Sequence, residues 1–501
     1  MTINTRKNKL CSWIPTLVIV IIVAVSVIVS VAVRVQAFPT TAAARARSIV
    51  LLGRRRRARN IMSSVMTSTT NETNDTKRRK VTMNTTSSSS DESSPSSSIF
   101  FRATETASEA KCLTDGVLLP TYPYEPRSGD GKEDKGSSGT TETISSIPSQ
   151  PVILPWVGYG TYKLPKDRAR SLTLQALQHG YRMIDTAFIY GGETIETQVG
   201  LALKDALLGR KQILNRREEV CVVTKHWRKY HGYDQTKECL RLSLKRLQLD
   251  YIDLYLIHWP GPAWSTMNRK NSEIEKHGPW HYATHSKEEM PNLRAETWRA
   301  MEDALINDQV RAIGVCNFTI KHLKELKKTA RFWPPAVNQI ECHPIFPQQE
   351  LLDYCAQEGI VVQAYSSLGG QDAGKKFWRS IYPLEKNQKK TSTECVTSLM
   401  ETPPVIELAA KSRNKTPGQI LLRWALEKNL VIIPKTTSQT RMVENSNIFD
   451  FSLSKDDMDS LDRQLQQALK NAAEREEGNE SIESMSRLAW RRDPLRDLDF
   501  E

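Results

Sequence analysis

From about residue 151 onward, short apolar runs alternate with stretches in which apolar residues recur every three or four positions. A short apolar run bounded by polar residues is typical of a buried parallel strand, and the three-to-four spacing is typical of a helix with one buried face. Eight such strands separated by helices predict a closed (β/α)8 barrel, a TIM barrel, over residues 151–470. The predicted strands are 156–160, 182–186, 220–225, 252–258, 311–317, 336–340, 360–366 and 430–435, and the predicted helices are 168–179, 194–208, 236–248, 294–308, 321–329, 348–357 and 417–428.

The competing fold is an open, doubly wound sheet, which binds a dinucleotide through Gly-x-Gly-x-x-Gly after its first strand. The corresponding stretch here is Gly158-Tyr-Gly160-Thr-Tyr-Lys163, which lacks the third glycine. The sequence therefore favours the barrel. The predicted connections 261–291 and 369–404 are unusually long, and loops of this length are commonly lids or binding loops. We expect both to overhang the face of the barrel where substrate enters.

The first 40 residues predict contact with a membrane. Residues 16–33 form an almost unbroken Val/Ile run that is preceded by Arg6, Lys7 and Lys9. A basic segment followed by an apolar one indicates either a secretory signal peptide, here with a cleavage site after Ala37, or a membrane-anchoring transmembrane helix. The sequence leaves both open, and either way residues 1–40 engage a membrane at least during targeting.

Residues 41–110 are rich in Arg, Ser and Thr and poor in apolar residues, which predicts a disordered segment. The composition is that of a transit peptide, and its position behind a signal resembles the bipartite plastid leaders of algae with complex plastids. A simple disordered stalk has the same composition. The predicted localisation is therefore the secretory route, ending either at a membrane or in a complex plastid. Residues 111–150 are predicted to be a linker, and residues 471–501 a charged C-terminal tail.

Charge and cysteine content exclude several classes of function. The net charge is +13, but residues 1–110 hold 16 Lys and Arg against 6 Asp and Glu, whereas the other 391 residues hold 54 against 51. Because the excess belongs to the leader, a nucleic-acid-binding role is not expected. The eight cysteines show neither paired nor zinc-site spacing. They predict mostly buried thiols, and no metal site.

Candidate chemistry lies at the ends of the predicted strands. In a barrel, polar residues at the C-terminal ends of strands are typically catalytic or ligand-binding. Seven of the eight strands end in such residues, and these are Asp185, Lys225, His258, Asn317, Gln339, Tyr365 with Ser366, and Lys435.

Four candidate residues form a set that can protonate a carbonyl oxygen. A buried Asp185 needs a cation, and Lys225 at the next strand end can supply it. Tyr190 follows Asp185 by five residues, and we expect the ammonium of Lys225 to lower its pKa from about 10 toward neutrality. Tyr190 could then donate its proton as hydride reaches the carbonyl carbon, while a neutral His258 holds the oxygen.

Other strand ends suit a nicotinamide cofactor. The amides of Asn317 and Gln339 match a carboxamide, and Tyr365 can stack on a flat ring. Lys435 and Arg441 flank the start of a predicted short helix, an arrangement that binds phosphate.

With these residues in place, the chain over residues 156–469 resembles the aldo-keto reductase family. The resemblance implies a barrel that binds NADPH in an extended form across its mouth. Carried over residue by residue, it implies Tyr190 as the acid, tuned by Asp185 and Lys225, with His258 orienting a small carbonyl substrate. The matching motifs are Gly160-Thr-Tyr-Lys163, Asp185 with Tyr190, Lys225, Leu256-Ile-His258-Trp-Pro260, Gly314-Val-Cys-Asn-Phe318, Asn338-Gln-Ile-Glu341, Tyr365-Ser366 and Ile433-Pro-Lys435.

The same resemblance implies the remaining contacts. Nicotinamide is expected at Asn317, Gln339 and Tyr365, pyrophosphate at Ser366 and Leu368, the 2′-phosphate at Lys435, Thr436 and Arg441, adenine at Glu444 and Asn445, and substrate at Tyr162, Trp227 and Trp259. Two positions depart from the family pattern: Cys316 replaces a serine, and Tyr162 replaces a frequent tryptophan. The predicted function is NADPH-dependent reduction of aldehydes or ketones to alcohols. The alternative is a membrane-associated nicotinamide-binding regulatory subunit with little turnover, and the intact set of four catalytic candidates favours the enzyme.

Overall fold

The computed structural model divides the chain into two units, Met1–Ser94 and Pro95–Glu501. The structure describes residues 101–122, 151–210, 212–262, 289–370, 374–383, 396–412, 415–475 and 487–488, all of them in the second unit. The apolar run 16–33, the segment 41–100 and most of the predicted lid 261–291 therefore lie outside the described residues. Among the described helices, none has both the length and the apolar character that a membrane crossing requires.

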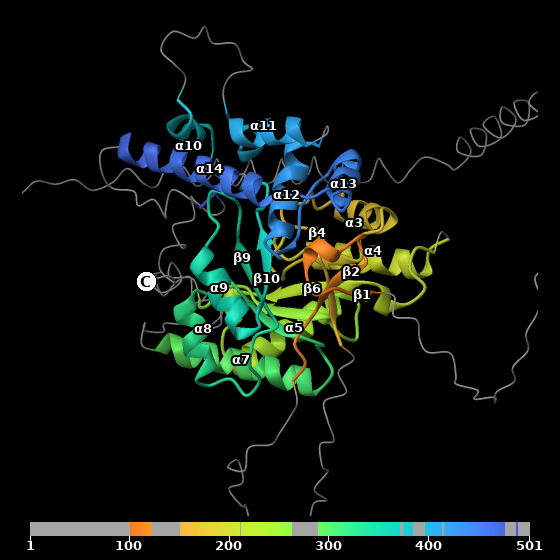
Figure 1. Ribbon diagram of the computed structural model, residues 1–501. Helices are drawn as coiled ribbons and strands as arrows, with labels where there is room; N and C mark the ends of the chain where they lie inside the picture. The colour runs from red at the N-terminus through yellow and green to blue at the C-terminus, as the bar shows by residue number, and fades with distance from the viewer. Residues whose placement is uncertain are drawn as a thin grey trace, which may run out of the picture. The chain divides into compact units, whose positions relative to one another are not determined.

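The eight predicted strands form one parallel sheet that closes into a barrel, which confirms the predicted fold (Figure 1). Closure is visible at the seam, where Val157 bridges Ile432 in parallel and the Gly158 amide donates to the Ile432 carbonyl at 2.8 Å. In chain order, the strands are β4 (Tyr159–Gly160), β5 (Met183–Asp185), β6 (Cys221–His226), β7 (Leu254–Ile257), β8 (Ile313–Cys316), β9 (Val337–Glu341), β10 (Val361–Tyr365) and β11 (Val431–Ile432).

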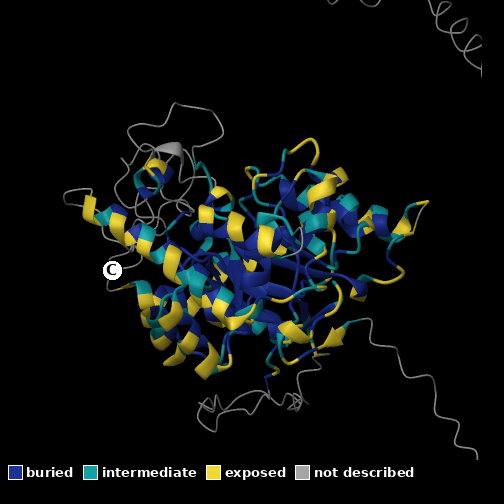
Figure 2. Ribbon diagram, turned by 45° about the horizontal axis from the view of Figure 1, so that its top comes forward, coloured by how far each residue is buried: buried dark blue, intermediate teal, exposed yellow. Residues whose placement is uncertain are grey.

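Helices surround the barrel with their apolar faces turned inward, so that burial decreases from the strands outward (Figure 2). The seven predicted helices are confirmed as α3 (Ala169–Gln178), α4 (Ile195–Leu208), α5 (Tyr233–Leu247), α7 (Met290–Ile306), α8 (Ile320–Lys327), α9 (Gln349–Glu358) and α12 (Pro417–Glu427). The predicted start of α12 is also confirmed: Thr416 caps it in a capping box with Gln419, and Pro417 occupies the first turn.

Four more helices follow β10 and β11. The short helix expected after Lys435 is α13 (Gln439–Ser446). Within the predicted loop 369–404 lie α10 (Gly374–Ile381) and the start of α11 (Pro403–Lys411), and α14 (Lys455–Arg475) ends the helical part of the chain. The Arg475 guanidinium donates to the Ser380 carbonyl at 2.8 Å, which joins the C-terminal end of α14 to α10.

A small second sheet precedes the barrel. It contains β1 (Arg102–Ala103), β2 (Asp115–Leu118) and β3 (Ile153–Pro155), with β1 and β2 parallel and β2 and β3 antiparallel. Arg102 pairs with Asp115, and the Trp156 indole donates to the Thr104 hydroxyl at 2.8 Å. The fold thus includes residues 101–118, which lie in the segments that the sequence assigns to leader and linker.

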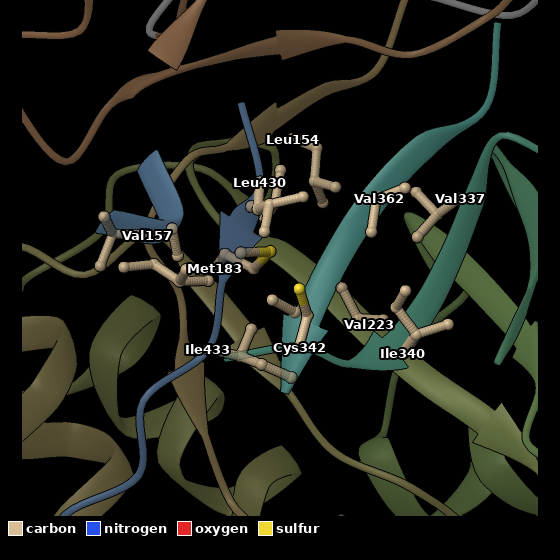
Figure 3. Packing of buried hydrophobic residues seen from close by; sticks show 14 of the residues in the cluster. Leu154, Val157, Met183, Val223, Val337, Ile340, Cys342, Val362, Leu430 and Ile433 are labelled. Carbon is tan, nitrogen blue, oxygen red and sulfur yellow. The ribbon is translucent and has the colours of Figure 1, made fainter. Parts of the chain in front are cut away.

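Buried side chains from many strands fill the barrel (Figure 3). At the seam, Met183 lies against Gly158, where an added Cβ would come within 2.4 Å of the Met183 methyl. The register places Asp185 beside Val223 and Lys225 beside Leu256, so these strand ends share one rim of the barrel. That rim carries the candidate site.

Candidate active site

Asp185 and Lys225 form a fully buried ion pair, as the sequence predicts. The Lys225 ammonium lies 2.7 Å from Oδ1 and 2.8 Å from Oδ2 of Asp185, and it also donates to the Thr186 carbonyl at 2.7 Å. A third residue also contacts this carboxylate: the Gln339 amide donates to Asp185 Oδ2 at 2.8 Å. Three strands, β5, β6 and β9, therefore fix this carboxylate.

Tyr190 follows β5 and is buried next to this pair. The Lys225 ammonium lies 5.2 Å from the centre of the Tyr190 ring. The expectation of a lowered phenol pKa is wrong for this structure: burial raises the pKa of Tyr190 well above its usual value, and the negative charge of Asp185 raises it further. The physical reason is that burial removes the water that would stabilise the phenolate, and the nearby Asp185 carboxylate repels its negative charge. Tyr190 is consequently protonated at neutral pH, the form that a proton donor requires.

His258 follows β7 and packs edge-on against Tyr190, with 5.9 Å between ring centres. Burial lowers the pKa of His258 well below its usual value, and the cations Lys225 and Arg228 lower it further. The imidazole is therefore neutral near pH 7. Its Nδ1 atom is buried and makes no hydrogen bond in this structure, so one ring nitrogen is not committed to a protein partner.

The three expected substrate residues differ in position. Tyr162 is half-buried with its ring centre 5.0 Å from that of Tyr190, and Trp227 is half-buried at 5.8 Å from the His258 ring. Trp259 is buried and lies under the Arg228 guanidinium at 5.2 Å. Tyr162 and Trp227 therefore flank the Tyr190–His258 pair, whereas Trp259 supports His258 from within the protein.

The residues expected at the nicotinamide form a connected group. The Tyr365 hydroxyl donates to Asn317 Oδ1 at 2.7 Å, and Asn317 Nδ2 donates to the His258 carbonyl at 2.9 Å. Cys316, in place of a serine, accepts a contact from Asn317 Nδ2 at 3.2 Å through its buried sulfur. Burial raises the pKa of this thiol far above its usual value, so Cys316 is a neutral, weak partner for the neighbouring amides.

The expected phosphate end lies where β11 leads into α13. Lys435 is half-buried, and burial lowers its pKa, as does the neighbouring charge of Lys163. A second cation near the half-buried Lys435 favours an anion there, which would relieve the repulsion between the two charges. Arg441 lies exposed in the first turn of α13, whose N-cap is Ser438. The start of α13 is therefore cationic, as the sequence predicts for a phosphate site.

The other expected cofactor residues surround the same region. Thr436 and Asn445 are buried, while Glu444, Ser366 and Leu368 are partly exposed. The Tyr159 hydroxyl donates to the Thr436 carbonyl at 2.6 Å, and the Gln419 amide donates to the Glu444 carbonyl at 3.2 Å. These contacts hold the segment after β11 in place.

Several neighbours were not identified from the sequence. Lys163, the cation near Lys435, could have been found only from its place in the Gly160–Lys163 motif. Glu193, three residues after Tyr190, pairs with Lys229 at 3.1 Å and Arg246 at 2.7 Å. It adopts a left-handed φ of 72°, as do Gly191 and Gly192 at 59° and 61°. The consecutive glycines Gly191 and Gly192 were the sequence feature that could have predicted this left-handed turn. Among the described residues, no group of three or more His, Cys, Asp or Glu is placed to hold a metal ion.

Comparison with known proteins identifies the family. The aldo/keto reductase family model matches residues 156–466. Glyoxal reductase of Bacillus subtilis is 36% identical over 312 residues, which are 62% of this chain and 89% of that protein. Aldo-keto reductase family 1 member A1 of Mus musculus is 36% identical over 312 residues, which are 62% and 85% of the two chains. A solved structure of a Bombyx mori aldo-keto reductase in complex with NADP is 31% identical and covers 62% of this chain and 89% of that one, with a TM-score of 0.49. The chain therefore belongs to the aldo/keto reductase family.

Proposed function

We propose that this chain is an NADPH-dependent reductase of aldehydes or ketones, with Tyr190 as the general acid. The observation that carries the proposal is the placement of Tyr190 between the buried Asp185–Lys225 pair and a neutral His258. The family relationship supports the same chemistry, since one relative is named glyoxal reductase and a solved relative was crystallised with NADP.

Each residue has a separate task in this proposal. The neutral His258 holds the carbonyl oxygen through a ring N–H, and the protonated Tyr190 donates its hydroxyl proton to that oxygen as negative charge develops on it. The O–H bonding electrons stay on Tyr190 as a phenolate, which lies near the Lys225 ammonium until a proton returns from solvent. Asp185 keeps Lys225 in place, and its carboxylate balances the positive charge of the ammonium in the resting state.

NADPH, when bound, supplies the hydride to the carbonyl carbon. We assign the nicotinamide to Asn317 and Tyr365 and the 2′-phosphate to Lys435 and Arg441. Gln339 has a second role beyond any ligand contact, because its amide also donates to Asp185 at 2.8 Å and to Gln363 at 2.6 Å. The side chains of the half-buried Tyr162 and Trp227 are proposed to contact the substrate.

The test is Tyr190→Phe, assayed by NADPH consumption with a panel of small aldehydes. The variant should lose turnover by about a hundredfold or more, the scale of general acid–base catalysis, because it retains the ring and loses only the acidic proton. Its NADPH affinity, measured by fluorescence titration, should stay within about twofold of wild type, since the hydroxyl holds the reacting oxygen and not the cofactor.

Tyr354→Phe is the matched control, because it removes a phenolic hydroxyl from the outer helix α9 and should leave turnover unchanged. Near wild-type turnover in Tyr190→Phe would remove Tyr190 as the acid. A wild-type chain that binds NADPH and yet reduces none of the aldehydes would favour the alternative, a membrane-associated nicotinamide-binding regulatory subunit.

A further inference from the structure

One residue of the segment predicted to be a charged C-terminal tail, Leu488, lies inside the protein. Leu488 is fully buried. Its backbone N–H donates to the carboxylate of Glu341 at 2.5 Å, and the same carboxylate contacts His343 Nε2 at 3.0 Å. Glu341 is the last residue of β9, two positions beyond Gln339. A hydrogen bond to a charged acceptor in a buried position is strong, so Leu488 is attached to the rim that carries the candidate site.

The side chain of Leu488 packs against the turn that follows β10. A Cβ added to Gly369 would lie 3.4 Å from Leu488 Cδ1 and 2.9 Å from Leu399 Cβ, so these two leucines enclose the glycine. The turn is closed by a hydrogen bond from the Gly369 amide to the Ser366 carbonyl at 2.7 Å. Ser366 and Gly369 have left-handed φ values of 56° and 81°. A left-handed non-glycine residue such as Ser366 persists only where its surroundings impose that conformation. Leu488 packs against Gly369, whose amide closes the same turn on the Ser366 carbonyl.

The neighbouring residue Arg487 affects Tyr365, the ring expected at the nicotinamide. Its guanidinium lies 5.1 Å from the centre of the Phe346 ring. Burial raises the pKa of the Tyr365 phenol, Glu341 raises it further, and Arg487 lowers it. Both charges therefore act on Tyr365, which immediately precedes Ser366.

We propose that Leu488 is a positioning residue for the cofactor: it holds the turn 366–369 in the shape that receives the pyrophosphate of NADPH. This inference rests on the proposed function, since it needs NADPH at Ser366 and Leu368. It adds a contribution from beyond the part of the chain that the family model matches, which ends at residue 466. Without Leu488, the turn loses one of its two leucine walls and samples other conformations.

The test compares Leu488→Ala and Leu488→Val in the full chain, with NADPH as the probe. If the competent turn falls to about one fifth of the population in Leu488→Ala, the apparent Kd for NADPH rises about fivefold, because affinity scales with the competent fraction. Leu488→Val removes less of the side chain and should raise the Kd by a smaller factor, at least about twofold on the same argument. The single-turnover rate at saturating NADPH should stay within about twofold of wild type, since the turn positions the cofactor and not the reacting groups.

Leu465→Ala is the matched control, because Leu465 is equally buried but lies on α14. It should lower the Tm as Leu488→Ala does and leave the Kd unchanged. Equal Kd values for wild type, Leu488→Ala and Leu488→Val would overturn the proposal and reduce Leu488 to a core residue. If Leu488→Ala does not fold, Leu488→Val alone decides in the same way. Failure of the wild-type chain to bind NADPH would instead contradict the proposed function.

Discussion

Single charged residues decide which dinucleotide this site should prefer. NADPH differs from NADH by one phosphate, and Lys435 and Arg441 flank the start of α13, where we place that phosphate. Charge-assisted hydrogen bonds are worth about 1.5–3 kcal/mol each. Two such bonds imply a preference for NADPH of at least about a hundredfold, because 1.4 kcal/mol is a factor of ten.

Arg441→Ala should therefore weaken NADPH binding by about tenfold or more and leave NADH binding nearly unchanged, since one charge-assisted bond to the extra phosphate is lost. Titration of each variant with both cofactors measures this, and added salt should reduce the preference because Arg441 is exposed. Arg463→Ala, an exposed arginine on α14, is the control. Equal weakening of both cofactors would assign Arg441 to the fold or to the shared pyrophosphate.

Among the elements, the turn after β5 places the Tyr190 phenol. Gly191 and Gly192 both have left-handed φ values, so an alanine at either position costs roughly 1–2 kcal/mol. They differ in space: a Cβ on Gly191 would lie 2.8 Å from Ile195 Cγ1, whereas a Cβ on Gly192 has only the flexible Lys166 Nζ nearby, at 3.7 Å. Ile195 is the buried first residue of α4, so it has little freedom to move.

Gly191→Ala should thus displace the turn, while Gly192→Ala should only strain it. We expect kcat to fall about tenfold or more in Gly191→Ala, because small misplacements of a catalytic group are costly, and to stay within about threefold of wild type in Gly192→Ala. Steady-state kinetics beside thermal unfolding of both variants measures this. Similar kcat values for two equally destabilised variants would contradict a specific role of the Gly191 backbone in placing Tyr190.

Local patterns predicted elements well and long-range contacts poorly. The strands that carry Asp185, Lys225 and His258 at or next to their C-terminal ends were predictable because each is a short apolar run, and the barrel geometry then brings these ends together. The Gln339–Asp185 hydrogen bond joins residues 154 positions apart, and no periodicity encodes such a pair. The burial of Leu488 was missed for a related reason: one leucine in a charged segment has no pattern, and its partner Glu341 lies 147 positions away.

At the scale of the whole molecule, the second unit begins its regular structure at Arg102, the first residue of β1. Arg102 pairs with Asp115, Thr104 accepts from the Trp156 indole, and the Ala107 amide donates to Asn429 Oδ1 at 3.0 Å beside α12. Cleavage within this segment would therefore separate contacts that join it to the barrel. We propose that residues 1–100 serve targeting and that any processing occurs upstream of residue 101.

A fluorescent protein fused after residue 100 should enter the secretory route or a complex plastid, because residues 16–33 and the Arg/Ser/Thr-rich segment behind them have the composition of a signal followed by a transit peptide. Microscopy of this fusion is the measurement, and the same fusion without residues 16–33 is its control, which should spread through the cytosol. N-terminal sequencing of the protein purified from its own cells locates the processing site: a new N-terminus after Ala37 indicates a cleaved signal, and an intact residue 16–33 segment indicates an anchor. A diffuse signal from the full fusion would contradict the targeting role. An N-terminus between residues 104 and 118 would contradict processing upstream of residue 101, since the protein would then function without the strand that Arg102 begins.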